Sequence, residues 1–342
     1  MRKVIVNKCY LELTSNCNLR CKHCYNDSGM KVREIDYERI KHLIDEVELL
    51  GNQGVTLSGG EPLLYSKIRE LLIFLNSKKL EVTLITNATL IDDGFVQFIH
   101  DNNINNIKLQ ISLEGGTKET HDNIRGMGTF ERIMSVSEML SREKIPFYYR
   151  ITLSKSSCNE VHEIFEILKR YKQNYAKFSG LLPYGRINEN IELFPDSDEL
   201  YDAVKEIRLL AEENKVFAVL PDQLTESSCP LMRDDYEIMM SPRIDSEGNF
   251  YFCQSFNMQE LALGNINTAE LTEIIESEKM TLLRGLVKFR YLNLKECKKC
   301  FVKQICKGGC PAIVFSQNKL QGDDGFCRYR KKLYMEQLKL WH

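Results

Sequence analysis

The chain has 342 residues, of which 43% are hydrophobic and 27% are charged, a composition that is ordinary for a folded globular protein and excludes global disorder. Its 46 Lys and Arg residues nearly balance its 48 Asp and Glu residues, which argues against sequence-independent nucleic-acid binding. Because no apolar run is long enough to span a bilayer and the N-terminus lacks a signal-peptide core, we expect a cytoplasmic protein without membrane or nucleic-acid partners.

The first two-thirds of the chain alternates short apolar runs with amphipathic stretches. Runs rich in β-branched or aromatic residues predict strands over 10–14, 55–58, 81–86, 107–113, 147–153 and 177–182. Apolar residues that recur every three or four positions predict helices over 40–50, 68–75, 95–100, 130–140, 161–169 and 200–212. Repeated strand–helix units imply parallel strands with right-handed crossovers. Since six units are fewer than the eight of a closed barrel, we predict an α/β fold, a partial (β/α)6 TIM-like barrel over residues 1–214, with its chemistry at the C-terminal ends of the strands.

The alternation stops after residue 214, and residues 215–342 are predicted to form a second, smaller domain. Residues 243–253 predict a β-hairpin because turn-forming residues stand at 245–248. Residues 328–341 predict a terminal helix. The stretch 297–310 has four cysteines and no clear period, so we expect it to need a metal staple.

Twelve cysteines are unusual for such a chain. Without a secretion signal, their close spacing indicates metal ligands more than disulfides. Cys17, Cys21 and Cys24 follow the first predicted strand with C-x3-C-x2-C spacing. Three thiolates on one loop can bind three irons of a [4Fe–4S] cube and leave the fourth iron open. The alternatives are a zinc site completed by His23 and a loop of unliganded thiols.

A second motif, Ser58-Gly59-Gly60-Glu61-Pro62, follows the second predicted strand. The two glycines let the backbone approach a ligand closely, and the Glu61 carboxylate can accept a hydrogen bond from an ammonium group. A Gly-Gly pair alone is usually only a turn, so this motif is informative in combination with the cysteines.

Together these motifs resemble those of the radical S-adenosylmethionine (SAM) superfamily. The further matching segments are 86–90, 112–115, 121–125 and 128–130, and the resemblance covers about residues 8–215. It implies that one electron from a cluster held by Cys17, Cys21 and Cys24 cleaves SAM to methionine and a 5′-deoxyadenosyl radical, which abstracts a hydrogen atom.

The same resemblance implies a set of SAM contacts. His23 would lie near the adenine, Gly59, Gly60 and Glu61 around the ammonium group, and Ser112 and Arg125 on the carboxylate and ribose side. The alternatives are a loop histidine at 23 that faces solvent or only supports a ligand-binding residue, and a solvated arginine at 125. Glu114 stands where Asp is more common in the family, and its role is left open.

The C-terminal cysteines resemble the SPASM domain, which binds auxiliary [4Fe–4S] clusters, over about residues 229–327. The resemblance implies that Cys297, Cys300, Cys306 and Cys327 hold a distal cluster and that Cys229, Cys253 and Cys310 hold a nearer one, which makes three clusters in the protein. With seven ligands, the nearer cluster either keeps an open iron or takes a ligand from elsewhere. The alternative is a two-zinc ribbon. Cations crowd this region, either to stabilise an anionic cluster or as a solvated basic face: Lys298, Lys299, Lys303, Lys307, Arg328, Arg330, Lys331 and Lys332.

Two cysteines remain outside these motifs. Cys9 and Cys158 are most simply buried small hydrophobes. A sharper interpretation is a thiol that donates a hydrogen atom, as in the peptide epimerases of the superfamily, with Cys158 as the candidate, or the missing cluster ligand.

The resemblance implies a radical SAM oxidoreductase that matures a ribosomally made peptide by a thioether, C–C or C–O crosslink or another oxidation. Only about ten residues precede the first predicted barrel strand, so we expect no leader-binding module; a separate leader-binding protein would present the precursor peptide, or the enzyme would bind it directly. Flavodoxin or ferredoxin would donate the electron. A sulfatase maturase is disfavoured because Gln254 replaces the acidic base after Cys253. Porphyrin decarboxylation and a zinc-stapled scaffold protein are two more hypotheses that the sequence leaves open.

Overall fold

The computed structural model describes residues 3–221, 229–232 and 237–339. The chain divides into two compact units. The barrel unit comprises Leu11–Tyr37 and Gln53–Pro221, and the cysteine-rich unit comprises Met1–Tyr10, Glu38–Asn52 and Asp222–His342. The second unit therefore includes two segments from the N-terminal part of the chain as well as its C-terminal third.

A parallel sheet in the order β3-β4-β5-β6-β7-β8 forms the centre of the barrel unit. Its strands are β3 Gly54–Gly59, β4 Glu81–Thr86, β5 Ile107–Leu113, β6 Phe147–Leu153, β7 Tyr175–Gly180 and β8 Phe217–Val219, and β2 (Lys8–Thr14) precedes β3 in the sheet order. The six predicted strands, β2 to β7, are confirmed. The additional strand β8 has three residues, which is too short for a periodic pattern.

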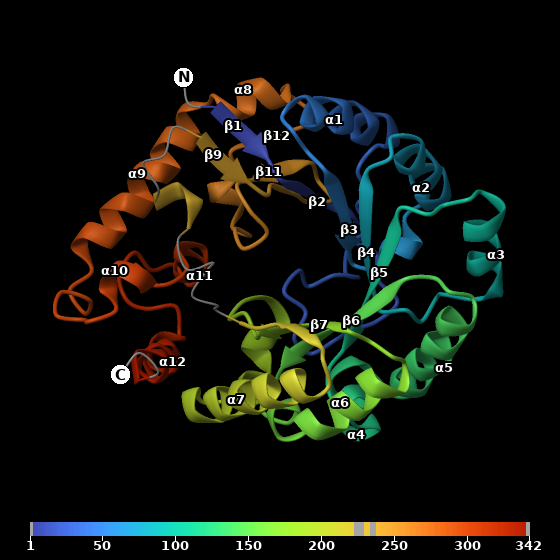
Figure 1. Cartoon of the computed structure of the whole chain (residues 1–342). Helices are drawn as coiled ribbons and strands as arrows, with labels where there is room; N and C mark the ends of the chain where they lie inside the picture. The colour runs from blue at the N-terminus through green and yellow to red at the C-terminus, as the bar shows by residue number, and fades with distance from the viewer. Residues whose placement is uncertain (1–2, 222–228, 233–236, 340–342) are drawn as a thin grey trace. The chain divides into compact units, whose positions relative to one another are not determined.

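Helices alternate with these strands and lie along the outer side of the sheet (Figure 1). They are α2 Ile68–Ser77, α3 Asp93–Asp101, α4 Lys118–Arg125, α5 Thr129–Arg142, α6 Val161–Arg170 and α7 Ser197–Glu213, with 3-10 turns η1 Pro62–Leu64, η2 Ser157–Asn159, η3 Gly185–Glu189 and η4 Ile191–Leu193. Adjacent residues of β5 are buried on both faces of the sheet, as parallel sheets require. The unit is thus the partial barrel that the strand–helix rhythm predicts.

Side-chain caps define where several barrel helices begin. The Asp92 carboxylate accepts a hydrogen bond from the Phe95 N–H at 2.8 Å, at the start of α3. Asp196 and Glu199 form a reciprocal capping box at the start of α7. Such caps satisfy backbone N–H groups that have no partner inside the helix.

The cysteine-rich unit contains short strands and six helices within its described residues. β1 (Lys3–Val6) pairs in parallel with β9 (Glu237–Met240), and β10 (Arg243–Ile244), β11 (Asn249–Tyr251) and β12 (Gly264–Asn265) form an antiparallel ribbon. The predicted hairpin is confirmed. The helices are α1 Tyr37–Leu49, α8 Leu271–Ile275, α9 Glu278–Asn293, α10 Lys303–Cys306, α11 Pro311–Ser316 and α12 Cys327–Lys339, with turns η6 Pro230–Met232 and η7 Gln259–Leu261. The predicted terminal helix is α12, whereas α9 was not predicted.

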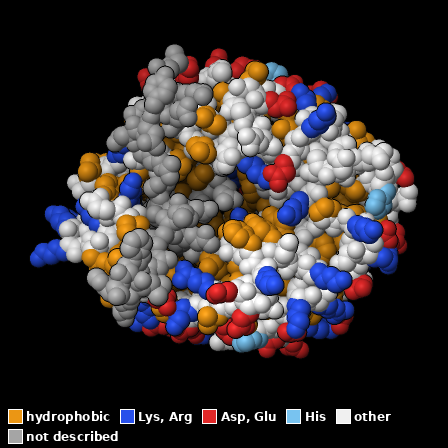
Figure 2. Space-filling model, in the orientation of Figure 1, with side chains coloured by type: hydrophobic (Ala, Val, Ile, Leu, Met, Phe, Trp, Pro, Cys, Tyr) orange, Lys and Arg blue, Asp and Glu red, His pale blue; other side chains and the backbone are white. Residues whose placement is uncertain are grey.

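Charged side chains of both signs are interspersed over the barrel helices on the face that Figure 2 shows. This mixture matches the near-balance of acidic and basic residues in the sequence. Among the described helices, none combines the length and the apolar character needed to cross a membrane.

Candidate active site and cysteine centres

The loop that follows β2 brings Cys17, Cys21 and Cys24 together. Burial, together with the nearby Glu61, Cys21 and Cys24 side chains, raises the pKa of the Cys17 thiol to about 11. Burial also raises the pKa of Cys21. With raised pKa values these two thiols are protonated near neutral pH. They must lose these protons to bind a metal, because only thiolates are ligands.

Gly59 and Gly60 lie against the chain segment that leads into the cysteine loop. The Gly60 N–H donates to the Thr14 carbonyl at 2.7 Å, and the Glu61 N–H donates to the Asn16 carbonyl at 2.8 Å. A Cβ at Gly59 would lie 2.3 Å from the Thr14 carbonyl oxygen, and a Cβ at Gly60 would lie 2.2 Å from that of Asn16. Glycine is required here because the two backbone segments approach each other so closely.

The buried Glu61 carboxylate connects the ends of two strands. It accepts hydrogen bonds from the Thr86 hydroxyl at 2.7 Å, the Asn87 N–H at 2.8 Å and the Leu63 N–H at 3.3 Å. Burial raises the pKa of Glu61 to about 7, although the three hydrogen bonds oppose this rise. Since a carboxylate offers about four acceptor positions, the side chain retains capacity for one further donor.

The segment after β4 also contacts the cysteine loop directly. The Asn87 side-chain amide donates to Asn18 Oδ1 at 3.0 Å, and Asn18 Nδ2 donates to the Thr89 hydroxyl at 2.8 Å. The matching segments at 58–62 and 86–90 therefore hold the loop from two sides.

Glu114 is the centre of an ionic cluster at the end of β5. Its Oε1 accepts from the Arg125 guanidinium at 2.8 Å (Nε) and 2.5 Å (Nη2), and it lies 3.2 Å from His23 Nε2. Burial alone would raise the pKa of Glu114, but His23 and Arg125 outweigh it and hold that pKa below the ordinary value. Arg125 Nη1 lies 3.8 Å from Cys21 Sγ. The role of Glu114, which the sequence left open, is thus to pair Arg125 and His23.

Several buried polar atoms of this cluster have no hydrogen-bond partner among the described residues. They are Glu114 Oε2, His23 Nδ1 and His121 Nε2. Because buried polar atoms are almost always satisfied by protein, water or ligand, these atoms fit a polar cosubstrate such as SAM. Ser112 lies on β5, two residues before Glu114, and is buried with 9% of its surface exposed.

A contact that the sequence did not indicate comes from η3. The Arg186 Nε donates to the Cys21 carbonyl at 3.0 Å, its backbone N–H donates to the Cys24 carbonyl at 3.0 Å, and its Nη1 pairs with Asp27 at 2.6 Å. Gly185 (φ +75°) packs so closely that a Cβ would lie 2.3 Å from the Cys24 carbonyl oxygen. No local pattern marks these residues, because their partners are about 160 positions away in the chain.

The two remaining cysteines are both buried. Cys9 lies on β2 in the cysteine-rich unit, and burial raises its pKa far above the ordinary value. Cys158 lies in η2 after β6, and burial raises its pKa to about 12. Their placement accords with small buried hydrophobes, and hydrogen donation by Cys158 stays a prediction.

The C-terminal cysteines fall into two groups by the neighbouring thiols that raise their pKa. Burial and then Cys306 and Cys300 raise the pKa of Cys297, and burial, Asp323, Cys306 and Cys297 raise the pKa of Cys327. In the second group, Cys310 interacts with Cys253, and burial raises the pKa of Cys310 to about 12. Cys229 directly precedes η6 and is half-buried.

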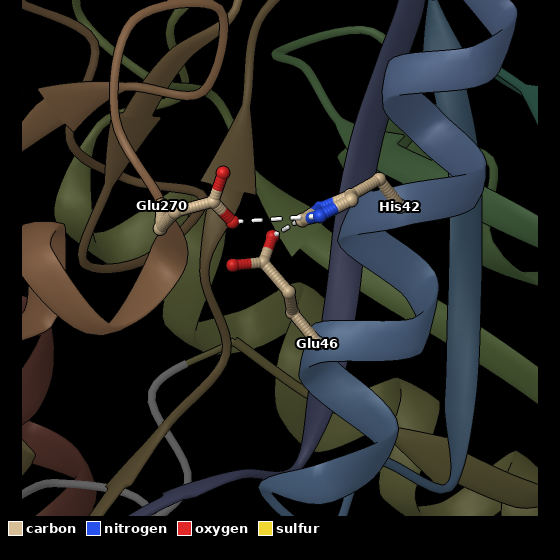
Figure 3. A group of neighbouring side chains, drawn as sticks. All are labelled: His42, Glu46 and Glu270. Carbon is tan, nitrogen blue, oxygen red and sulfur yellow. Dashed lines mark hydrogen bonds and ion pairs between the residues drawn. The ribbon is translucent and has the colours of Figure 1, made fainter.

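His42, Glu46 and Glu270 form a further cluster in the cysteine-rich unit (Figure 3). His42 Nδ1 lies 3.2 Å from Glu46 and Nε2 lies 3.5 Å from Glu270, so the two ring nitrogens face different carboxylates. The Arg39 guanidinium lies 3.9 Å from Glu46 and 4.0 Å from Glu270. This cation and the ring orientation indicate an ion-pair network that links α1 to the start of α8, and not a metal site.

Two family models match the chain. Residues 11–168 match the Radical SAM superfamily, and residues 239–301 match SPASM, an iron-sulfur cluster-binding domain. The matches cover the cysteine loop and the Cys253–Cys300 segment, respectively.

Full-length relatives carry different activities. The chain is 29% identical over 344 residues to the AdoMet-dependent heme synthase of Methanosarcina barkeri, covering 93% of this chain and 95% of the relative. It is 26% identical to the cysteine-type anaerobic sulfatase-maturating enzyme of Clostridium perfringens, covering 87% and 86%. Sequence similarity therefore leaves the substrate open.

Solved structures share the fold. The structure of anSMEcpe with bound AdoMet has a TM-score of 0.74 at 22% identity and covers 97% of this chain and 92% of its own. Streptococcus suis SuiB bound to S-adenosylmethionine has a TM-score of 0.75 at 16% identity, with coverages of 94% and 77%. At these identities the similarities establish a shared fold.

Proposed function

Since the chain contains a radical SAM domain followed by a SPASM domain, and such domains take SAM and [4Fe–4S] clusters as cofactors, we propose that it modifies a ribosomally made peptide by abstracting a hydrogen atom. The product would be a thioether, C–C or C–O crosslink or another oxidation. Two independent requirements follow: a site for SAM at the cysteine loop, and a site for peptide.

Cys17, Cys21 and Cys24 are the proposed ligands of the catalytic cluster. When bound, this cluster supplies the electron that cleaves SAM to methionine and a 5′-deoxyadenosyl radical. Gly59, Gly60 and Glu61 hold the cysteine loop, and the remaining acceptor position of Glu61 would receive the SAM ammonium. Glu114 orients Arg125 and His23, whose neighbouring unpartnered atoms would bind the rest of SAM.

The observation that carries this assignment is the convergence of three motifs on one loop. The segments at 58–62 and 86–90 and the Glu114–Arg125 pair all contact residues 14–24. A structural metal site needs only its ligands, whereas this one is surrounded by buried polar atoms without partners among the described residues. That arrangement favours a reactive cofactor site over a zinc staple.

Solved structures of similar proteins support a peptide substrate, and one residue narrows the reaction within that class. The solved relatives include anSMEcpe with a Cp18Cys peptide and SuiB bound to the precursor peptide SuiA. Within the peptide class, Gln254 is an exposed neutral residue after Cys253, and it cannot act as the carboxylate base that formylglycine formation uses in similar enzymes. We therefore propose a crosslinking maturase with flavodoxin or ferredoxin as electron donor, whose precursor peptide is either presented by a separate leader-binding protein or bound directly.

The second candidate is a porphyrin-modifying enzyme. It is favoured by the heme synthase of M. barkeri, which aligns with nearly the whole of both chains. The two candidates differ in the substrate that stimulates SAM cleavage, so one assay separates them.

The test uses anaerobically reconstituted protein with SAM and dithionite, and it measures 5′-deoxyadenosine by liquid chromatography. Candidate Cys-rich precursor peptides are compared with iron coproporphyrin and with no addition. We expect stimulation by the peptide, loss of product when its target Cys is replaced by Ala, and no turnover in a Cys17→Ala, Cys21→Ala, Cys24→Ala variant. Stimulation by the porphyrin alone would overturn the peptide assignment. Stoichiometric zinc without iron would overturn the assignment as a radical SAM enzyme.

A further inference from the structure

Three charged side chains are buried among the C-terminal cysteines. Arg290, Asp324 and Arg330 are at most 4% exposed. They contrast with the exposed Lys298 and Lys299 beside the same cysteines. Since burying a charge is costly unless it is paired, each of the three requires a counter-charge.

Asp324 links the two cysteine groups. Its carboxylate pairs with the Arg330 guanidinium, with Nη1 at 2.8 Å from Oδ1, and it accepts from the Cys310 N–H at 2.8 Å. Arg330 Nη1 also lies 3.8 Å from Cys306 Sγ. One continuous chain of contacts therefore runs from Cys306 in the first group through Arg330 and Asp324 to Cys310 in the second.

Arg290 is the second cation of this region. Its Nη2 donates to the carbonyls of Gly308 and Gly322, both at 2.8 Å, but its buried Nε has no partner among the described residues. Burial lowers the pKa of Arg290, and Asp324 together with Cys297, Cys310 and Cys306 opposes this change. A buried guanidinium with an unused donor beside several thiols requires an anion, and thiolate-ligated iron-sulfur clusters are anions.

The turn between Cys306 and Cys310 packs closely against Arg290 and Asp324. Gly308 (φ +79°) and Gly309 (φ +76°) both have positive φ angles, in the left-handed region that favours glycine. A Cβ at Gly309 would lie 2.4 Å from the Asp324 carboxylate, and a Cβ at Gly308 would lie 2.2 Å from Leu294 and 3.2 Å from Arg290 Nη1. The Gly-Gly pair thus brings the cysteine turn into contact with the buried charges.

We propose that Arg330, positioned by Asp324, and Arg290 set the reduction potential of the cluster held by Cys297, Cys300, Cys306 and Cys327, and that Asp324 couples this cluster electrostatically to the Cys253–Cys310 group. The inference rests on the proposed function, because it requires auxiliary clusters. Reduction adds one negative charge to the cluster, so nearby cations favour the reduced form and raise its potential, whereas the Asp324 carboxylate opposes them. All three are positioning residues and not cluster ligands.

The test is a redox titration of the reconstituted holoenzyme followed by electron paramagnetic resonance, with iron counted in each sample. Arg330→Gln should move one midpoint to a more negative value, by about tenfold in the reduced-to-oxidised ratio at fixed potential, which corresponds to about 59 mV for one electron. Arg330→Lys keeps the positive charge, so its midpoint should stay close to that of the wild type. Asp324→Asn should move the potential in the positive direction. Lys319→Gln, which removes an exposed cation outside the cysteine segments, is the control and should leave the midpoints unchanged.

The outcomes separate this inference from the proposed function. Full iron with unchanged midpoints in Arg330→Gln and Asp324→Asn would overturn the inference alone. If Arg330→Gln loses iron, Asp324→Asn decides, and an unchanged midpoint in Asp324→Asn with full iron would overturn the inference. Wild-type protein that binds only enough iron for the N-terminal cluster would overturn the auxiliary clusters and the inference together, whereas SAM cleavage in that protein would still be measured separately.

Discussion

Glu114 and Arg125 form a paired ionic contact in which one carboxylate oxygen receives two guanidinium nitrogens, at 2.8 Å and 2.5 Å. Both side chains are nearly inaccessible to solvent, with 1% and 12% of their side-chain surfaces exposed. Burial opposes the charge on Arg125, but Glu114 outweighs it and raises the Arg125 pKa above its ordinary value. The pair connects the end of β5 with the end of α4 beside Cys21.

Replacing Glu114 by Gln should destabilise the protein strongly. The substitution leaves the buried Arg125 charge without its counter-ion, which typically costs about 3–5 kcal/mol. Glu114→Asp keeps the charge and should recover most of this loss. The free energy of unfolding in urea, followed by circular dichroism under anaerobic conditions, measures the effect. Equal unfolding midpoints for wild type and Glu114→Gln would show that the pair contributes nothing.

Asp122 is expected to stabilise the start of α5. Its carboxylate accepts from the Gly128 and Phe130 N–H groups, both at 2.8 Å, and from the Thr129 hydroxyl at 3.2 Å. Although burial alone would raise the pKa of Asp122, these hydrogen bonds lower it below the ordinary value. Asp122→Ala should lower the free energy of unfolding by about 1–2 kcal/mol, as the loss of a helix cap does. Asp122→Asn, which keeps an acceptor oxygen, should lose less; a larger loss in the Asn variant would contradict the capping role.

His121 should make the protein sensitive to acid. Burial, reinforced by the Arg125 cation, lowers the pKa of His121 to about 4, although Glu114 and Asp122 oppose the change. In the unfolded chain the imidazole binds its proton near pH 6.5. Between pH 6.5 and 4 the unfolded state therefore holds more protons, and the stability that neutral His121 contributes is present above pH 6.5 and lost as the pH falls toward 4.

The measurement compares wild type with His121→Gln, whose side chain does not titrate. The difference in unfolding free energy between the two should change by about 3 kcal/mol from pH 7 to pH 4. Carboxylates elsewhere affect both proteins equally and cancel in the difference. Parallel stability curves across this range would contradict the prediction.

Arg186 should be needed to hold the N-terminal cluster. Arg186→Gln removes the hydrogen bond to the Cys21 carbonyl and the ion pair with Asp27, so the cysteine loop should become less ordered. We expect less iron per protein and a loss of 5′-deoxyadenosine formation of about tenfold or more, because small misplacements at a reacting centre lower the rate strongly. Gly185→Ala, which forces a Cβ against the Cys24 carbonyl, should act in the same direction.

The control for this pair is Arg142→Gln. Arg142 is an exposed residue of α5 that pairs only with its neighbour Glu143 among the contacts described, so its replacement should leave iron and activity unchanged. Wild-type iron content in Arg186→Gln would show that Arg186 is not needed to hold the N-terminal cluster.

The sequence by itself predicted the strands β2 to β7, the terminal helix and the hairpin. These elements follow from local chemistry, since alternating or three-to-four spacing and turn residues act over a few positions. It also singled out the loop of Cys17, Cys21 and Cys24, because ligand spacing within one loop is a local property. The helix α9 was missed because its apolar residues are not confined to one face: Leu283 and Val287 are buried, whereas Leu282 and Phe289 are exposed.

Only the tertiary structure decided which side chains meet. The Arg186–Cys21 contact joins residues 165 positions apart, and the Arg125–Cys21 contact joins residues 104 apart. It also showed that Asp324 pairs with Arg330, one of several cations near the cysteines, and not with the exposed lysines. Such pairings depend on which loops the folded topology brings together and on which charges it removes from water, and neither property is encoded in the spacing of neighbouring residues.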